Sequence, residues 1–184
     1  MNIRPAQISD IDEILRIQAL CYTSIEPERA EAFINKLQQA PDCAFVVEDK
    51  NDAIKDTGDN YDAGRKESRP LLAYLFALPI RTEQPPALDA DDFIVPPEAD
   101  CLYLHDLAID PSARGLGLST PLLEAFFNTA RAQGFTQTSL IAIQNSVPFW
   151  QRYGFHNRHP LSQDAELQAR ISVYGEAAYL TCAL

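Results

Sequence analysis

The sequence of 184 residues lacks the long apolar runs that mark membrane proteins. No apolar stretch reaches the roughly 18 residues that a membrane-spanning helix needs. The N-terminal segment MNIRPAQISD also lacks the apolar stretch that is typical of a signal peptide. We therefore expect a cytoplasmic protein that has no membrane partner.

Paired cysteines are absent as well. The four cysteines are scattered along the chain without a CxxC pair, at Cys21, Cys43, Cys101 and Cys182. Cys43 and Cys101 lie in apolar, strand-like surroundings. This pattern favours buried free thiols over disulfides or a zinc site, and we expect no metal.

Positive charge is in short supply. Fifteen Lys and Arg residues face 26 Asp and Glu residues, which gives a net charge of −11. Such a balance argues against nucleic acid as a partner, because phosphate backbones are bound by cationic surfaces, and it mildly favours a cationic substrate. The hydrophobic content of 46% and the charged content of 22% are typical of a globular domain, and the length suits one domain over residues 1–184.

The most informative stretch is LYLHDLAIDPSARGLGLSTPLLEAFFNTARAQG, residues 102–134. Its first eight residues are rich in aliphatic side chains, as in a strand that is covered on both faces, and Asp110-Pro111 ends that strand. From Leu118 onward, apolar residues recur at helical spacing until Gly134, which favours a helix end. The stretch therefore predicts a strand, a glycine-bearing loop and an amphipathic helix.

The junction between this strand and this helix suits a pyrophosphate. The first turn of a helix leaves backbone N–H groups unpaired and carries partial positive charge. Gly115 and Gly117 would let a ligand approach the backbone closely, and Arg114 adds a cation. An ordinary strand-to-helix turn would use the same glycines, so these few residues alone leave both interpretations open.

A wider pattern resembles a known family. The run RGLGLS, residues 114–119, resembles the Q/R-x-x-G-x-G/A signature of the GNAT superfamily of acyl-CoA-dependent N-acyltransferases, with Ser119 in place of the last Gly or Ala. The preceding LAIDP is similar to the end of the family's central strand. The run FWQRYGF, residues 149–155, resembles its second block, with Trp150 in place of a tyrosine. The resemblance covers nearly the whole chain.

This resemblance implies an α/β fold, a GNAT-like layered domain with a central mixed β-sheet flanked by helices. The residue patterns predict strands near residues 1–6, 43–48, 71–80, 102–109, 136–143, from 154, and 177–184. Two helices are expected in the first part of the chain, one that begins at residue 10 and one from Pro27 to about residue 39. Three more are expected later: one that begins at residue 118, a short one that follows Ser146 and ends at Tyr153, and one over residues 164–169.

Two polar segments, residues 51–69 and 81–100, are expected to be loop insertions. The second carries six acidic residues, Glu83, Asp89, Asp91, Asp92, Glu98 and Asp100. One interpretation is a mobile flap beside the acceptor site, whose acids attract an amine. The other is a plain solvated loop.

The resemblance also implies acetyl-CoA as co-substrate. Backbone groups at Leu107, Ala108 and Ile109 would then bind the pantetheine arm and polarise the thioester carbonyl. An asparagine contacts the cofactor in many members, and Asn145 is the candidate here. The phosphate loop maps to Arg114, Gly115, Leu116, Gly117, Leu118, Ser119 and Thr120.

His105 is the candidate general base, because histidine titrates near neutral pH. Strand alternation predicts that Tyr103, His105 and Leu107 share one face and that Asp106 points to the other and makes a structural hydrogen bond. A hydrogen-bonded core histidine is the alternative. The position of His105 and the run VPFWQRYGF are similar to arylalkylamine (serotonin) N-acetyltransferases, whose second histidine is Tyr103 here. We expect Tyr22, Tyr103 and His105 to contact the substrate, although Tyr22 could also be a packing aromatic.

Trp150 stands where most members have a tyrosine that protonates the departing thiolate. An indole N–H donates hydrogen bonds but is not a usable acid. Three interpretations follow: Trp150 stabilises the thiolate by hydrogen bonding, Tyr153 one turn later takes over the role, or the protein binds the cofactor without efficient transfer.

The predicted function is an acetyl-CoA-dependent N-acetyltransferase, EC class 2.3.1, that acts by direct attack in a ternary complex on a primary amine of a small molecule. The first alternative is a protein or peptide acetyltransferase acting on lysine or N-terminal amines. The second is a non-catalytic acyl-CoA-binding module. A homodimer is also an expectation of the resemblance.

Overall fold

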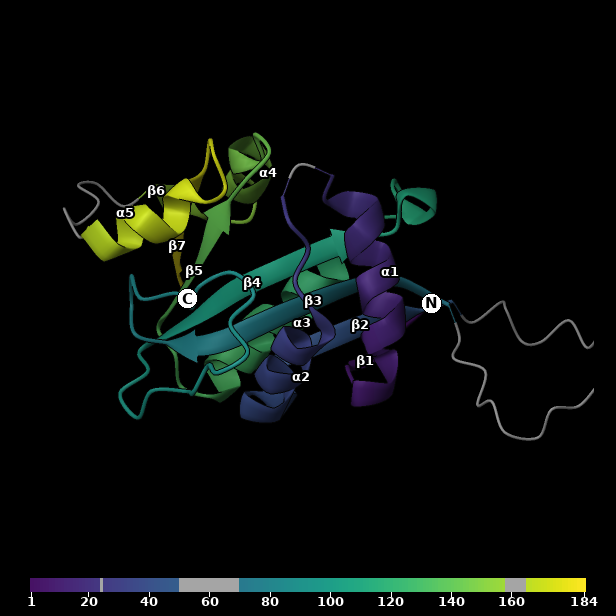
Figure 1. The fold of residues 1–184 in the computed structure, drawn as a ribbon, viewed down its shortest axis with the longest axis horizontal. Coiled ribbons are helices and arrows are strands. Elements are labelled where there is room, and N and C mark those ends of the chain that lie inside the picture. Colours follow the sequence, from purple (N-terminus) through teal and green to yellow (C-terminus); the bar gives the residue numbers. More distant parts are fainter. Residues whose placement is uncertain (24, 50–69, 158–164) are drawn as a thin grey trace, which may run out of the picture.

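The computed structural model describes residues 1–23, 25–49, 70–157 and 165–184 (Figure 1). In these residues seven strands form one mixed sheet, in the order β1-β2-β3-β4-β5-β7-β6. The pair β4 and β5 is parallel, and the neighbouring pairs are antiparallel. The strands are β1 (Asn2–Pro5), β2 (Ala44–Glu48), β3 (Leu71–Ile80), β4 (Cys101–Ile109), β5 (Gln137–Ala142), β6 (His156–Asn157) and β7 (Ala178–Ala183).

Helices cover both faces of this sheet (Figure 1). On one face, Phe33 of α2 packs with Tyr74 and Phe76 of β3 at ring-centroid distances of 6.1 and 5.0 Å. On the other face, Leu122 and Phe126 of α3 are buried in a hydrophobic core between this helix and the sheet. The predicted layered α/β architecture is confirmed. The described helices are α1 (Ile11–Cys21), α2 (Ala30–Gln39), α3 (Ser119–Ala132), α4 (Val147–Gln151) and α5 (Ala165–Ser172).

The second helix begins later than the sequence predicts. Pro27 was expected at its start, but α2 begins at Ala30. The side chain of Gln18 accepts from the backbone N–H of Glu28 and donates to its carbonyl, both at 2.9 Å. These two bonds hold the chain before α2 out of the helix, with Arg29 in an extended conformation. The non-helical turn that results places the Glu28 side chain inside the protein.

The acidic insertion over residues 81–100 is tied to the body of the protein. Asp89 and Asp91 form ion pairs with Arg29 at 2.6 and 3.1 Å. Asp100 accepts the backbone N–H of Thr82 at 2.7 Å. Asp89, Asp91 and Asp100 are therefore engaged with protein donors, and the interpretation that the acidic segment attracts an amine stays a prediction. The insertion over residues 51–69 lies outside the described residues.

A β-bulge interrupts β4 at His105. Leu104 pairs with Ala77 of β3 and Asp106 pairs with Phe76, so His105 is an extra residue without a partner of its own. A bulge of this kind bends a strand and redirects its side chains. The predicted alternation is therefore wrong beyond this point: His105 and Asp106 both line one pocket, whereas Leu107 packs with the core on the α3 side.

Other features bear on the classes considered from the sequence. Within the described residues, no helix is long and apolar enough to cross a membrane. In the same part of the chain, no group of three or more His, Cys, Asp or Glu residues is placed to hold a metal ion. The four cysteines all lie in the described residues and form no disulfide there, and Cys43 and Cys101 are buried.

Candidate active site

A cleft opens between β4 and β5 where the two strands separate. Their parallel pairing covers only Leu102–Leu104 opposite Thr138–Leu140, and it ends just before the bulge at His105. Beyond that point, a cavity of about 650 Å³ lies between the strands, including the open space at its mouth. It is lined by Tyr22, Leu104, His105, Asp106, Leu107, Leu140, Ile141, Ile143, Gln144, Ser146, Phe149 and Trp150.

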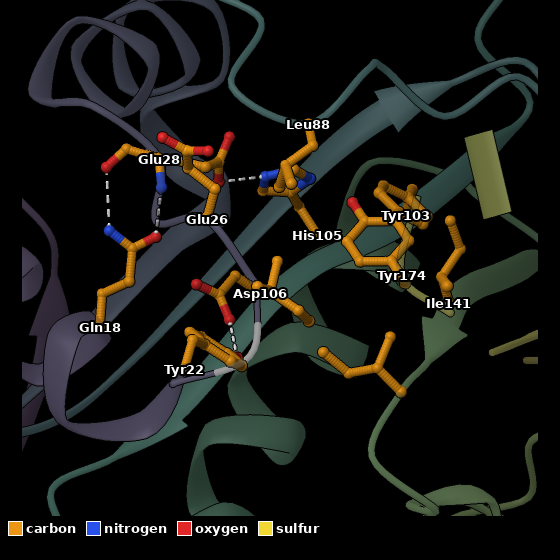
Figure 2. Close-up of a pocket in the computed structure, with 12 residues that line it drawn as sticks. Gln18, Tyr22, Glu26, Glu28, Leu88, Tyr103, His105, Asp106, Ile141 and Tyr174 are labelled. Atoms are coloured by element: carbon orange, nitrogen blue, oxygen red, sulfur yellow. Dashed lines mark hydrogen bonds and ion pairs between the residues drawn. The ribbon is translucent and has the colours of Figure 1, made fainter. Parts of the chain in front are cut away.

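A second pocket of about 450 Å³, again including its mouth, lies on the side of α1 and α2 (Figure 2). Its wall combines tyrosine rings and aliphatic side chains with carboxylates. Both cavities share the side chains of Tyr22, His105 and Asp106, so they meet at the bulge. The pocket is lined by Gln18, Tyr22, Ile25, Glu26, Glu28, Leu88, Tyr103, His105, Asp106, Ile141, Ile143 and Tyr174.

His105 belongs to a buried charged cluster. Its Nε2 lies 2.7 Å from Oε1 of Glu28, and Oε2 of Glu28 lies 2.6 Å from Nζ of Lys36 (Figure 2 shows the His105–Glu28 pair). The side chains of His105, Glu28 and Lys36 are 2%, 3% and 0% exposed. Charges at this depth persist only when they are paired, and here each finds its partner inside the protein.

The geometry assigns the tautomer of His105. In the neutral form of His105, the bond to Glu28 assigns the proton to Nε2 and leaves Nδ1 as the acceptor. Among the described residues, Nδ1 is buried and has no hydrogen-bond partner. A side chain at the junction of two cavities thus keeps one free proton-accepting atom.

The ionised form of Glu28 is favoured by its neighbours. Burial alone would raise its pKa, but attraction and hydrogen bonding to His105 and Lys36 outweigh burial and lower the pKa from 4.5 to about 2. The backbone N–H of Asp89 donates a further bond to Oε2 at 2.9 Å. Glu28 therefore stays a carboxylate and fixes the orientation of the His105 ring.

Asp106 occupies the same wall and is held by two tyrosines. The hydroxyl of Tyr22 donates to Oδ1 (Figure 2), and the hydroxyl of Tyr74 donates to Oδ2 at 2.6 Å. Burial raises the pKa of Asp106 despite these bonds. The structural hydrogen bond expected for Asp106 is confirmed. Tyr22 packs against the core and also lines the pocket. Its role as a substrate contact stays a prediction.

The glycine loop before α3 has the features of an anion site. Gly115 and Gly117 have φ angles of +82° and +73°, and an added Cβ at either position would meet open space. Of the described residues, none accepts a backbone hydrogen bond from Gly115, Gly117, Leu118 or Ser119. Free N–H groups at a helix N-terminus suit phosphate groups, so the loop fits the pyrophosphate of CoA.

Trp150 and Tyr153 differ in their relation to the cleft. Trp150 lines it, and its indole N–H donates to Oγ of Ser146 at 3.1 Å. The hydroxyl of Tyr153 instead lies 3.3 and 3.1 Å from the hydroxyls of Ser119 and Thr120, at the first turn of α3. This geometry is contrary to the interpretation that Tyr153 replaces the missing acid, because its hydroxyl is engaged outside both cavities.

Two further expectations concern the cofactor. Asn145 was expected to contact it, but Asn145 lines a separate hollow with Ile25 and Tyr174 and is not part of the cleft wall. Leu107, one of the residues whose backbone was expected to bind pantetheine, lines the cleft. The carbonyl of Ile109 instead accepts a hydrogen bond from the thiol of Cys21 at 3.3 Å. Ala108 packs into the core on the α1 side.

Sequence reasoning missed Glu28, Lys36 and Ser146. Glu28 and Lys36 are ordinary charged residues in a segment that reads as the start of a helix, and nothing local marks them as buried. Their burial depends on contacts across 77 positions to His105, which no pattern in the sequence displays. Ser146 follows two residues with positive φ, Gln144 and Asn145, which sequence patterning did not predict.

Comparisons with known proteins agree with this geometry. Residues 95–169 match the model of the acetyltransferase (GNAT) domain. Solved structures that span this chain fully include a GNAT-like decarboxylase, GphF, in complex with isobutyryl-CoA, at a TM-score of 0.70 and 14% identity over 99% of that chain. The chain has the GNAT fold.

Similar proteins also include a second solved structure and a curated sequence. Ard1 from Thermoplasma volcanium matches at a TM-score of 0.67 and 14% identity, over 100% of this chain and 97% of that chain. Glucosamine 6-phosphate N-acetyltransferase from Trypanosoma brucei brucei is 32% identical over 53 residues, which cover 29% of this chain and 36% of the relative. Residues 95–169 thus match the GNAT acetyltransferase domain, and the likeness to arylalkylamine enzymes stays a prediction.

Replacing Glu28 by Gln should destabilise the protein by roughly 3 kcal/mol at neutral pH, because Lys36 then lacks its buried counter-ion. The difference should shrink as pH falls from 4.5 toward about 2, since Glu28 of the wild type has its pKa lowered on folding and loses its stabilising effect in that window. Urea unfolding at successive pH values measures both quantities. Glu26→Gln, at an exposed position of the same pocket, is the control. A difference that does not change with pH would contradict the ion-pair assignment.

Replacing Gly117 by Glu should abolish CoA binding, because a carboxylate would stand where the loop presents its free N–H groups. Gly117→Gln introduces the same bulk and backbone strain without charge and should weaken binding less. Gly134→Glu, at a similar φ of +82° beyond the far end of α3, controls for strain. Calorimetric titration with CoA measures the affinities. Acetyl-pantetheine, which lacks the phosphates, should show no difference between the Glu and Gln variants, and unchanged CoA affinity in Gly117→Glu would refute the phosphate loop.

Proposed function

We propose that this protein is an acetyl-CoA-dependent N-acetyltransferase that acts on a small primary amine without an anionic group. The observation that carries the proposal is the meeting of two cavities at His105. The cleft between β4 and β5 would hold the pantetheine arm, and the glycine loop of α3 would hold the pyrophosphate. The pocket beside α1 and α2 would hold the acceptor, so both substrates reach one point from opposite sides.

This arrangement supports direct attack within a ternary complex. The ammonium form of the acceptor gives one proton to Nδ1 of His105, directly or through a water molecule, and the neutral nitrogen then attacks the thioester carbonyl carbon. The second proton leaves the nitrogen to solvent as the tetrahedral intermediate collapses. Glu28 stabilises the imidazolium through Nε2. The carbon–sulfur bond then breaks, its electron pair goes to sulfur, and the products are the acetylated amine and CoA. The chain itself forms no covalent bond.

The composition of the acceptor pocket supports the class of amine. Its wall carries the exposed carboxylate of Glu26, together with Glu28, whose charge Lys36 compensates, and Asp106, which two tyrosines hold. No Lys or Arg is among its described lining residues. An ammonium group is attracted to such a wall, whereas a carboxylate or phosphate on the acceptor would meet negative charge without a cation to pair with. The rings of Tyr22, Tyr103 and Tyr174 favour an apolar or aromatic body.

The alternative of a protein or peptide substrate is less well supported. Leu88, from the insertion over residues 81–100, lines the acceptor pocket. The insertion is fixed there by the Asp89–Arg29 ion pair and by the carbonyl of Ala90, which lies 3.4 Å from Nζ of Lys36. A covered pocket suits a small acceptor better than a chain. Cytoplasmic location and a homodimer stay predictions.

An acceptor screen with thiol detection tests the proposal. Phenylethylamine and tryptamine should be acetylated with kcat/KM at least roughly tenfold above phenylalanine and tryptophan, which differ only by the added carboxylate. Glucosamine 6-phosphate and a peptide with a free N-terminus complete the panel. Preference for the peptide would support the protein-acetyltransferase alternative. CoA binding without turnover of any acceptor would support a non-catalytic module.

Replacing His105 by Ala should lower kcat/KM most at neutral pH, by about 10²- to 10⁴-fold, where the acceptor is mainly an ammonium ion. The loss should become smaller as pH approaches the acceptor's own pKa, because free amine then accumulates without help from a base. A pH–rate profile from pH 6 to about 10 measures this. A loss of equal size at every pH would argue that His105 is only structural.

A further inference from the structure

Trp150 raises the question of which group stabilises the negative charge that develops on the leaving sulfur. Its indole has a single N–H, and that N–H already donates to Oγ of Ser146 at 3.1 Å. Trp150 is only 8% exposed, and its indole N–H is engaged with Ser146 inside the protein. The interpretation that Trp150 itself donates to the thiolate therefore conflicts with the bond that it makes.

Ser146 occupies the N-cap position of α4 but does not cap the helix with its side chain. Serine at this position ordinarily accepts a backbone N–H of the first turn through its hydroxyl. Here the backbone carbonyl of Ser146 accepts from Phe149 and Trp150, and the hydroxyl is turned to the indole. The side chain lies in the wall of the cleft, in the same cavity as His105.

The hydrogen-bond inventory of Ser146 leaves one group free. A hydroxyl has one donor and two acceptor sites, and the indole N–H occupies one of the acceptor sites. In the described part of the chain, no acceptor lies within bonding distance of the Ser146 O–H. A hydroxyl that accepts a hydrogen bond is polarised by it and donates more strongly through its own O–H. The bond from the N–H of Trp150 therefore makes the Ser146 hydroxyl a stronger donor.

We infer that Ser146, held and polarised by Trp150, donates a hydrogen bond to the sulfur of CoA as the carbon–sulfur bond breaks. This inference rests on the proposed function. The electron pair of the broken bond goes to sulfur, and Ser146 keeps its proton, because a serine hydroxyl is a far weaker acid than a thiol. CoA leaves as the thiolate and takes its proton from solvent, while the proton of the amine resides on His105.

Binding of the product CoA reports this contact without turnover. The bound thiolate should be stabilised by Ser146, whereas desulfo-CoA, which lacks the sulfur, cannot benefit. Tyr22, His105 and Asp106 also face the cleft, and a charge on any of them would act on the thiolate of CoA but not on desulfo-CoA. The wild type and Ser146→Ala share these three groups, so the change in the ratio of the two affinities between the two proteins isolates the effect of Ser146.

Calorimetric titration of the wild type, Ser146→Ala and Ser146→Thr with both ligands, below and above the ordinary thiol pKa of about 8.5, tests the inference. The wild type should gain preference for CoA over desulfo-CoA as the thiol ionises. Ser146→Ala should lose roughly tenfold or more of that preference at high pH, and Ser146→Thr, which keeps the hydroxyl, should retain it. Trp150→Phe should lose part of it. Partial unfolding of a variant weakens both ligands equally and leaves the ratio intact.

The outcomes separate the two proposals. An equal ratio in the wild type and Ser146→Ala at high pH would overturn the role of Ser146 and leave the acetyltransferase proposal standing. A full preference retained in Trp150→Phe would overturn the part assigned to Trp150. Failure of the wild type to bind either ligand would overturn both the inference and the proposed function. With acetyl-CoA, Ser146→Ala should also lower kcat and leave KM nearly unchanged.

Discussion

The buried carboxylate of Glu28 is the interaction on which the site depends. Its two oxygens reach β4 through His105, α2 through Lys36 and the insertion through the backbone of Asp89. Its own backbone is fixed to α1 by Gln18. Burying a carboxylate without partners would cost several kcal/mol, so these contacts must form together for the fold to close. The acceptor pocket is thereby assembled in the same step that satisfies the charge.

Lys36 gives this cluster its electrostatic balance. A lone carboxylate beside His105 would present uncompensated negative charge to the acceptor pocket. Because Lys36 neutralises that charge from the far side, Glu28 acts on the imidazole mainly as a directed hydrogen-bond acceptor. The imidazole ring is held in one orientation before any substrate arrives, which removes an ordering cost from the reaction.

The bulge at His105 connects this cluster to the cofactor cleft. It lies where the pairing of β4 and β5 ends, so the same irregularity opens the cleft and turns the imidazole toward it. It also brings Asp106 to the wall that His105 occupies. A regular strand would have placed these neighbours on opposite faces and kept the two strands in contact over a longer distance.

These features explain how far the sequence could predict the molecule. Periodicity and glycine placement predicted the strands, the layered fold and the loop at α3, because those signals are local. The bulge is invisible in residues 102–109, where every side chain suits a strand, and so the face of Asp106 was predicted wrongly. The start of α2 was misplaced because Pro27 favours a helix start locally, whereas the bonds from Gln18 to Glu28 decide the backbone there. Asn145 was assigned by family position alone; it has a positive φ and lines a hollow beside the cleft, and its contact with the cofactor stays a prediction.

The replacement of tyrosine by Trp150 has a coherent physical basis in this framework. A thiolate is a stable leaving group, so the site needs to stabilise charge on sulfur more than it needs to supply a proton. A tyrosine performs both tasks with one hydroxyl. Here an indole fills the space, and its N–H supports a serine hydroxyl that faces a cleft walled by Leu104, Leu140 and Phe149. In such apolar surroundings a single aligned donor stabilises charge more strongly than it would in water. The negative charge on sulfur and the positive charge on His105 then develop in one cavity, and their mutual attraction favours the transfer.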